Sequence, residues 1–492
     1  MIIAQLPALQ VVLPLLAAPL CVVLRGGFAA WLLAVATSWA AFAMAILLTG
    51  LVLAKGPISY AMGGWLPPWG IEYTIDSFNV LMLLIVSGTA AAILPFAQAS
   101  VADEIAPEQH ARFYSAFLLI LTGLLGMAAT GDVFNLFVFI EISSIATYAA
   151  IALGRDRRAL TAAFNYLVLG TVGATFYLIG VGLLYAVTGT LNTADLAARV
   201  APLLETRTVI VGFAFISVGL LLKVALFPLH QWLPNAYAYA PSVITTFLAA
   251  TATKVALYSL LRVAFAVFGA SYVLERLPTE AILLALAATA ILVASTTAIF
   301  QKDLKRLLAW SSLAQIGTIV LGVGIGTAQG MTGALLHMFG HALTKGALFM
   351  AAAAFALRLG GTSLEKLAGA GRRMPLTSAA LVLAGMSLVG VPLTAGFVSK
   401  WTIVLAALER GWWPVAAFVL ITSLLTLAYV LRVVEVLYFR PAADATVTRE
   451  APLSMLWPLW LMIAGIFYFG VDSSIPTRLA TTAATLLLGV AP

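Results

Sequence analysis

The sequence has few charged residues for its length and only one cysteine. Of its 492 residues, 9% are Asp, Glu, Lys or Arg and 63% are hydrophobic, and the mean hydropathy is +1.07. A water-soluble chain of this length needs more charge to cover its surface, so the composition predicts an all-α polytopic membrane protein. The single cysteine, Cys21, excludes a disulfide framework, a cysteine-ligated iron–sulfur cluster and a thiolate zinc site.

Other signals are also missing. No lysine or arginine precedes the first apolar run, so we expect residues 7–24 to be a membrane helix and not a removed signal. The net charge of +7 is dispersed among short loops, which argues against nucleic acid as a partner. The chain has no recognisable nucleotide loop, redox centre or quinone site. We therefore expect no cofactor and no catalytic centre of its own.

Long apolar runs dominate what is present. About 20 apolar residues cross a bilayer as a helix, and the sequence predicts fourteen such spans. An apolar tail at 479–490 is too short to count. The spans, numbered in order, are 7–24, 29–54, 77–97, 113–130, 133–153, 160–187, 208–227, 241–265, 279–300, 307–326, 330–357, 376–398, 413–437 and 453–470.

Cations set the expected orientation. The odd-numbered gaps between spans hold fourteen Lys and Arg, counting Arg25, whereas the even-numbered gaps hold six. The positive-inside rule then places the odd gaps in the cytoplasm and both termini outside. The setting we expect is a bacterial inner membrane.

The chain divides into two units of five spans, which we expect to be an inverted repeat. Residues 1–112 hold three spans, 113–265 the first unit, 279–440 the second unit, and 450–492 the last span and tail. The fourth span of each unit is interrupted by proline, at Pro228 and at Pro392. Matched breaks in two halves point to an ion site in transporters, since freed backbone groups can face a wet cavity there.

Three ionisable residues lie deep within predicted spans. Lys223 and Lys254 each sit in an apolar run, and a buried ammonium costs about 3 kcal/mol or more unless a partner or water receives it. Glu141 lies about 13 Å into its span, so we expect it to pair with Lys223. A purely structural ion pair is the alternative for this pair, and an interfacial lysine is the alternative for Lys254.

A polar stripe marks span eleven. His337, His341 and Lys345 are spaced i, i+4, i+8 and so share one helix face. Histidine exchanges protons near neutral pH, so the stripe predicts part of a proton relay. A hydrogen-bonded core histidine is the alternative; zinc is disfavoured because no HExxH motif and no nearby third ligand occur. Lys400 follows the Pro392 break, where a simple interfacial lysine is also possible.

Four motifs, in order, carry a family resemblance. The runs LLKVALFPLHQWLPNAYAYAPSVITTFLAATATKVALY, QKDLKRLLAWSSLAQIG, GALLHMFGHALTKGALFM and GRRMPLTSAALVLAGMSLVGVPLTAGFVSKW resemble the proton-translocating subunits of respiratory complex I and Mrp-type multisubunit cation/proton antiporters. GGWLPPWGIEYTIDSF and GDVFNLFVFIEISSIATYAAIAL are most similar to the D subunit of Mrp antiporters and its relatives in membrane-bound hydrogenases. The resemblance covers roughly residues 75–440.

The resemblance implies fourteen helices, two inverted five-helix repeats, broken helices at spans seven and twelve, and a hydrated polar axis at mid-membrane. It further implies a proton-translocation role for a set of residues that now includes the histidine of the first break. One departure is that span six opens LTAAFNYLVLG, where many relatives carry a lysine. The resemblance assigns this role to Glu141, Lys223, His230, Lys254, His337, His341 and Lys400, and the spacing of the span-eleven stripe adds Lys345.

Three functional interpretations stay open. The favoured one is a proton-translocating subunit of a Na⁺/H⁺ antiporter complex, with other membrane subunits as partners. The second is the proton-pumping arm of an NADH:quinone oxidoreductase or hydrogenase-like complex. The third is a scaffold whose polar residues only hold helices together.

Overall fold

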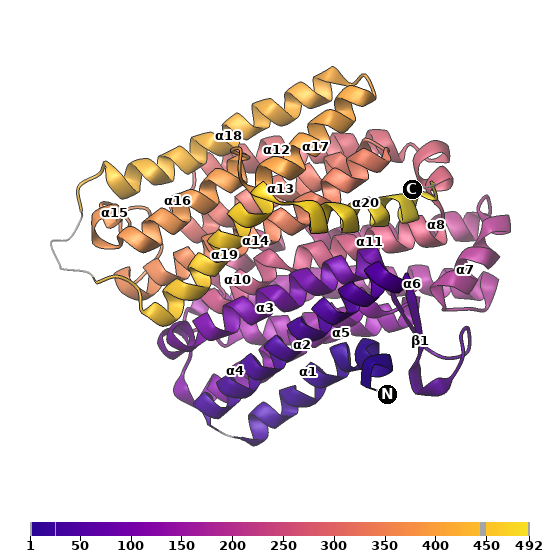
Figure 1. The fold of residues 1–492 in the computed structure, drawn as a ribbon, viewed down its shortest axis with the longest axis horizontal. Helices are drawn as coiled ribbons and strands as arrows, with labels where there is room; N and C mark the ends of the chain where they lie inside the picture. The colour runs from indigo at the N-terminus through magenta and orange to yellow at the C-terminus, as the bar shows by residue number, and fades with distance from the viewer. Residues whose placement is uncertain (1, 25, 443–448, 491–492) are drawn as a thin grey trace.

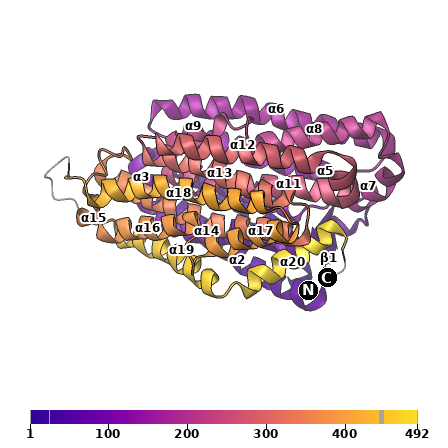
Figure 2. The same cartoon turned by 90° about the horizontal axis from the view of Figure 1, so that it is seen from above.

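The computed structural model describes residues 2–24, 26–442 and 449–490, and almost all of them are helical. Arg25, one of the cations counted for orientation, lies outside these ranges. Figures 1 and 2 show the long helices side by side, running along the longest axis of the molecule. Both chain termini lie at the end that carries β1 and α7, opposite α15 (Figure 1). A chain that crosses the membrane an even number of times must begin and end on the same side of it.

The described residues form twenty α-helices and one small hairpin. The helices up to the end of the first unit are α1 Leu6–Val23, α2 Gly27–Lys55, α3 Ser77–Glu104, α4 His110–Ala129, α5 Val133–Ala152, α6 Arg157–Thr188, α7 Thr193–Val200, α8 Arg207–Val224, α9 Trp232–Tyr239, α10 Ser242–Ala250 and α11 Ala252–Val267. They continue as α12 Thr279–Ile299, α13 Leu304–Gly324, α14 Ala328–Leu359, α15 Ala370–Arg373, α16 Pro375–Val389, α17 Ala395–Glu409, α18 Trp413–Tyr438, α19 Leu453–Val471 and α20 Ser474–Leu488. Short helical turns occupy Ile2–Gln5, Met62–Gly64, Pro107–Gln109, Ala201–Leu203 and Tyr272–Arg276. Strands β1 (Ile58–Ala61) and β2 (Glu72–Ile75) form the antiparallel hairpin.

The fourteen predicted spans are confirmed. Thirteen helical segments within the described ranges are long and apolar enough to cross a membrane. The remaining span, the twelfth, consists of α16 and α17, two halves of 15 residues each that are individually too short to cross. Neither helix has the length of a full span because the predicted break divides span twelve between them.

A backbone hydrogen bond at corresponding positions of the two units, which we call the clasp, supports the inverted repeat. The amide of Val133, at the start of α5, donates to the carbonyl of Leu191 after α6 at 2.9 Å. The amide of Leu304, at the start of α13, donates to the carbonyl of Thr362 after α14 at 2.8 Å. Both residues of the second clasp lie 171 positions after their counterparts. The first clasp is near α7 and the second is near α15, at opposite ends in Figure 1, so the second unit is inverted relative to the first.

The two predicted breaks are confirmed, and each is shaped by residues in a left-handed conformation. After α8, Ala225 has φ of +61°, and the chain passes Pro228 before α9 begins. After α16, Gly390 and Leu393 have φ of +94° and +70°, flanking Pro392. A third break divides span eight between α10 and α11 at Thr251, whose φ and ψ are −125° and −54°. No glycine or proline marks it, and the sequence did not predict it.

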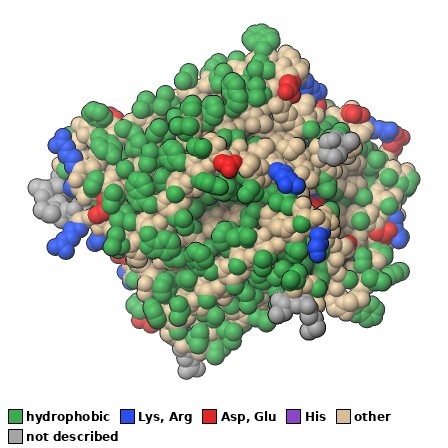
Figure 3. Space-filling model, viewed as in Figure 1, with side chains coloured by type: hydrophobic (Ala, Val, Ile, Leu, Met, Phe, Trp, Pro, Cys, Tyr) green, Lys and Arg blue, Asp and Glu red, His purple; other side chains and the backbone are tan. Residues whose placement is uncertain are grey.

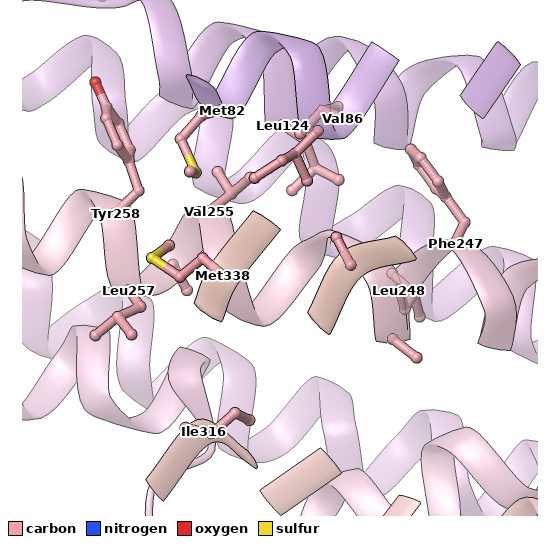
Figure 4. Close-up of a cluster of buried hydrophobic side chains, with 14 of the residues drawn as sticks. Met82, Val86, Leu124, Phe247, Leu248, Val255, Leu257, Tyr258, Ile316 and Met338 are labelled. Atoms are coloured by element: carbon pink, nitrogen blue, oxygen red, sulfur yellow. The ribbon is translucent and has the colours of Figure 1, made fainter. Parts of the chain in front are cut away.

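Apolar side chains enclose span eight. Figure 4 shows Met82 of α3, Leu124 of α4 and Met338 of α14 around Val255 of α11, with Phe247 of α10 further along span eight. All five are buried. A broken helix carrying a lysine is thus wrapped by hydrophobic contacts, which exclude lipid and bulk water from it.

The apolar tail is a further correction. Residues 474–488 form α20, which packs against α14 and α3. It follows α19 after an elbow at Asp472 and Ser473, and the two helices together form a bent fourteenth span (Figure 1). The tail was too short to count as a span by itself because it is the second half of a broken one.

Candidate functional site

Lys223 lies in the last turn of α8, just before the first break. Its side chain is buried, and its ammonium donates to the hydroxyl of Ser144 and, at 3.4 Å, to that of Tyr148. The indole N–H of Trp232 donates a hydrogen bond to the carbonyl of Leu222, at 3.0 Å, and so stabilises the C-terminal end of α8. The lysine is therefore held by two hydroxyls of α5.

The predicted ion pair between Glu141 and Lys223 is not formed. Ion pairs in the described part of the chain do not include these two residues, and Glu141 Oε1 is buried without a hydrogen-bond partner. Glu141, Ser144 and Tyr148 share one face of α5 because they are spaced i, i+3, i+7. The ammonium of Lys223 is bonded further along that face, to the hydroxyls of Ser144 and Tyr148.

A glycine makes room for this arrangement. A Cβ at Gly170 of α6 would lie 1.9 Å from the Tyr148 hydroxyl and 3.5 Å from the Lys223 nitrogen. Tyr148 packs edge-on against Tyr166, with ring centroids 4.8 Å apart, and Tyr166 stacks on Trp232 at 3.8 Å. A cavity of about 20 Å³ beside Ser144 and Lys223 reaches Ala252 at the start of α11, and such a volume holds about one water molecule.

Lys254 lies on α11, three residues after the Thr251 break. It is 1% exposed, and its ammonium donates to the carbonyl of Ala249, which precedes the break. A helix break leaves carbonyls without their usual amide partners. The unpredicted break thus supplies the acceptor that this lysine needs in an apolar environment.

The span-eleven stripe faces the interior, as its spacing predicts. His337 is held at both ring nitrogens, by Ser399 at 2.9 Å and by Gln315 at 3.0 Å. The ring of His341 stacks on that of His337, with centroids 5.9 Å apart. Both ring nitrogens of His341 are buried and have no partner among the described residues. One histidine is thus bonded at both ring nitrogens, and its neighbour is bonded at neither within the described residues.

Two further lysines are bonded to neutral oxygens. Lys345, at the end of the stripe, donates to the carbonyl of Leu308 at 2.9 Å and to the hydroxyl of Ser311. Lys400 of α17 donates to the carbonyls of Leu388 and Val389, at 2.9 and 3.0 Å, at the end of α16. The C-terminus of a helix is the negative end of its dipole and favours a cation.

Most of the predicted residues come together, and His230 does not. In the second unit, His337, His341 and Lys345 lie along one face of α14, and Ser399, which bonds to His337, precedes Lys400 on α17. Lys223 and Glu141 form a separate cluster in the first unit. His230 is half-buried between Phe227 and Trp310, with ring centroids at 5.1 and 5.4 Å. No hydrogen bond in the described chain joins it to either cluster.

Sequence reasoning missed the neutral partners. They are hydroxyl and amide side chains within apolar helices, and their helical spacing is the signal that could have found them. Ser311 and Gln315 are one turn apart on α13, within the predicted span 307–326. The missed partners are Ser144, Tyr148, Ser311, Gln315, Ser399 and Ser423.

This arrangement suits proton exchange. Each buried lysine touches oxygens that accept a hydrogen bond from the charged form and tolerate the neutral one, and an unpartnered histidine lies among them. A membrane protein of two inverted helical units, with broken helices and with lysines and histidines buried between its helices, belongs to the class of ion-translocating subunits.

Comparison with known proteins identifies the family. Residues 130–426 match the membrane family described as NADH:quinone oxidoreductase/Mrp antiporter, and the chain belongs to that family. It is 43% identical to NADH-quinone oxidoreductase subunit N of Desulforudis audaxviator, over 95% of this chain and 96% of that one. It is 29% identical to the D subunit of the Na⁺/H⁺ antiporter of Bacillus subtilis, over 88% of each chain.

The fold recurs in a solved structure. A chain of the membrane-bound sulfane sulfur reductase, an archaeal respiratory membrane complex, superposes with a TM-score of 0.90. It is 35% identical in sequence, over 98% of both chains. The resemblance to complex I and Mrp subunits inferred from four motifs is confirmed.

Proposed function

We propose that this chain is the proton-translocating subunit of a multisubunit monovalent cation/proton antiporter. The observation that carries the proposal is the set of buried lysines bonded to neutral oxygens, three of which, Lys223, Lys254 and Lys400, lie beside helix breaks. An ammonium without a carboxylate partner loses its proton at modest cost when buried. Membership in the antiporter family and the likeness to the D subunit of a Na⁺/H⁺ antiporter support the same function.

Protons pass between the two clusters through water and side chains. Lys223 releases its proton toward the water-sized cavity beside it, and Lys254, on the helix that borders this cavity, receives it. His341 then accepts a proton on one ring nitrogen and releases one from the other, and Lys400 is the final carrier. Each transfer moves one proton and leaves the donor neutral, so charge is conserved at every step.

Glu141 sets the charge state of Lys223. When the ammonium bonds to Glu141, the ion pair favours the protonated lysine. When it bonds to Ser144 and Tyr148 instead, the neutral form is favoured by burial, and the proton leaves. The observed contacts correspond to the second state, so the ion pair predicted from sequence belongs to the other half of the cycle.

The remaining parts of the function follow from this role. The chain works with other membrane subunits, and Na⁺ is the coupled cation. It lies in the inner membrane of a bacterial cell, with both termini outside, as the distribution of cations indicates. The driving energy enters from partner subunits, because this chain carries no cofactor in the proposal.

A redox-driven complex is the second candidate. It is favoured by the 43% identity to a subunit N of an NADH-quinone oxidoreductase and by the fold shared with a respiratory sulfane sulfur reductase complex. Purification with native partners separates the candidates: small antiporter subunits support the first, and iron–sulfur subunits support the second. Salt-sensitive growth on deletion is expected only for the antiporter.

Alanine variants at Glu141 and Lys223 test the assigned role. Proton movement is measured in everted membrane vesicles after assembly of the complex has been verified on a native gel. Both variants are expected to lower the rate at least tenfold. Normal proton movement by an assembled Lys223→Ala complex would reject the proposal, and reduced stability with unchanged transport would support the scaffold interpretation.

A further inference from the structure

The elbow between α19 and α20 places charged residues deep in the membrane. Span twelve has two halves of 15 residues each, so its break lies at mid-membrane. A Cβ at Gly470, near the end of α19, would lie 2.2 Å from the backbone oxygen of Leu393 in that break. Asp472 follows two residues later and is therefore at nearly the same depth.

Arg478 lies on α20 in the same region. It is one turn, about 6 Å, beyond Ser474, whereas half of the hydrocarbon layer is about 15 Å thick. Side chains on a helix tilt toward its N-terminus, so Arg478 leans back toward the elbow and away from the nearer surface. Both Asp472 and Arg478 are exposed on this chain.

Neither charge has an ion-pair partner within the described residues. Asp472 accepts a hydrogen bond from the amide of Ser474 at 3.0 Å. The ion pairs of residues 2–24, 26–442 and 449–490 include neither Asp472 nor Arg478. Hydrocarbon does not solvate a guanidinium, and exposed charges at this depth are covered in membrane proteins by other polypeptide or by water.

A groove adjoins the elbow. It has a volume of about 300 Å³ and lies between α2, α3, α14, α19 and α20, at the middle of α3 and α14. Small residues line part of it, among them Thr89, Ala92 and Gly465, and small residues let helices approach closely in membranes. Figure 3 shows acidic and basic side chains over α19 and α20 in an otherwise hydrophobic face, which is hollowed beside them.

We propose that this groove is the docking site for one transmembrane helix of a different subunit, which presents a carboxylate at mid-membrane to Arg478. A lipid acyl chain fits the apolar groove but offers Arg478 no anion, and a lipid headgroup is too far away. A second copy of this chain is a poor fit, because two concave faces leave a void between them. The inference is independent of the coupled ion.

Photocrosslinking tests the occupant. A photoreactive phenylalanine analogue replaces Ile475, an exposed residue of the groove, in the full chain expressed with its native partners. The expected product joins this chain to a single other subunit, at a transmembrane segment that contains Asp or Glu. Adducts to lipid alone, or to a second copy, would overturn the proposal. The same analogue at Leu424, exposed on α18, is the control for contact with lipid.

Charge reversal tests the contact. Arg478→Glu is expected to lower recovery of the crosslinked subunit at least tenfold, whereas Arg478→Lys retains most of it. Replacing the partner's carboxylate with lysine is expected to restore recovery with Arg478→Glu. Unchanged recovery with Arg478→Glu would refute the contact. Thermal unfolding of the purified variant chain controls for misfolding, and none of these measurements depends on proton transport.

Discussion

Replacing Gly170 with alanine is expected to disturb Lys223 without replacing any ionisable residue. The added methyl would lie 1.9 Å from the Tyr148 hydroxyl and 2.9 Å from the ring carbon that bears it. Ordinary carbon–oxygen contact requires about 3.5 Å, so Tyr148 must move by more than 1 Å, on the order of a full bond length. It is packed against Tyr166, which is itself stacked on Trp232, so the shift cannot be absorbed freely.

Two effects are expected from this displacement. Overpacking of a well-packed site costs about 1–3 kcal/mol of stability, which a thermal unfolding assay detects. Lys223 also loses one of its two hydroxyl partners, so proton movement in everted vesicles is expected to fall several-fold or more. The double variant Gly170→Ala with Tyr148→Phe removes the clash with the hydroxyl but leaves the ring carbon at 2.9 Å, so it is expected to recover part of the stability and none of the transport.

The same helix offers a matched control. Gly182 is exposed, and a Cβ there would meet nothing within 4 Å. Gly182→Ala is expected to leave transport unchanged and to stabilise α6 by about 0.5–1 kcal/mol, since glycine is unfavourable within a helix. If Gly170→Ala behaves like this control in both assays, the assigned packing around Lys223 is wrong.

Three further predictions concern buried polar groups. Arg262→Ala removes the ion-pair partner of the buried Asp76 carboxylate, which lies at 2.8 Å, and is expected to lower the free energy of unfolding by about 3–5 kcal/mol. The control is the exposed Arg276, which pairs with Glu205. Replacing Arg276 with alanine is expected to lower the free energy of unfolding by less than about 1 kcal/mol. Burial raises the pKa of Asp76, but the charge and hydrogen bonds of Arg262 outweigh this effect and hold the pKa below its ordinary value. The stabilisation from the Asp76–Arg262 pair is therefore complete above about pH 4 and is lost as the pH falls further. Acid unfolding that begins at the same pH in wild type and Arg262→Ala would contradict this. His337→Ala leaves the buried amide oxygen of Gln315 without its partner, whereas Ser399 keeps its hydrogen bond to the carbonyl of Gly396. His341→Ala removes no hydrogen bond between described residues. His337→Ala is therefore expected to be less stable by about 1–3 kcal/mol, although both variants slow proton movement; equal melting temperatures would count against the assigned contacts.

The spans and two of the breaks were predictable because their signals are local. Apolar runs of sufficient length define membrane helices wherever they occur. Pro228 and Pro392 interrupt spans because proline lacks an amide hydrogen and clashes with the preceding turn. The face shared by His337 and His341 follows from helix geometry alone. Each of these predictions needs only residues close together in the sequence.

What the sequence did not predict depends on contacts between helices. The break at Thr251 has no proline or glycine, and it is accompanied by the bond from Lys254 to the carbonyl that precedes it. The choice of Lys223 between Glu141 and the hydroxyls of Ser144 and Tyr148 is set by distances of a few ångströms across two helices. The elbow at Asp472 was missed because α20 is apolar but too short to qualify as a span.

The central claim is that buried lysines carry protons, and Lys254 tests it most directly. Lys254→Met keeps the packing and removes the titratable group, whereas Lys254→Arg keeps a positive charge that is not released, because arginine stays protonated in proteins. Proton movement is measured in everted vesicles containing assembled complex. The account predicts that both variants lower the rate at least tenfold. Transport at the wild-type rate with arginine at this position would contradict it, because a fixed charge would then suffice.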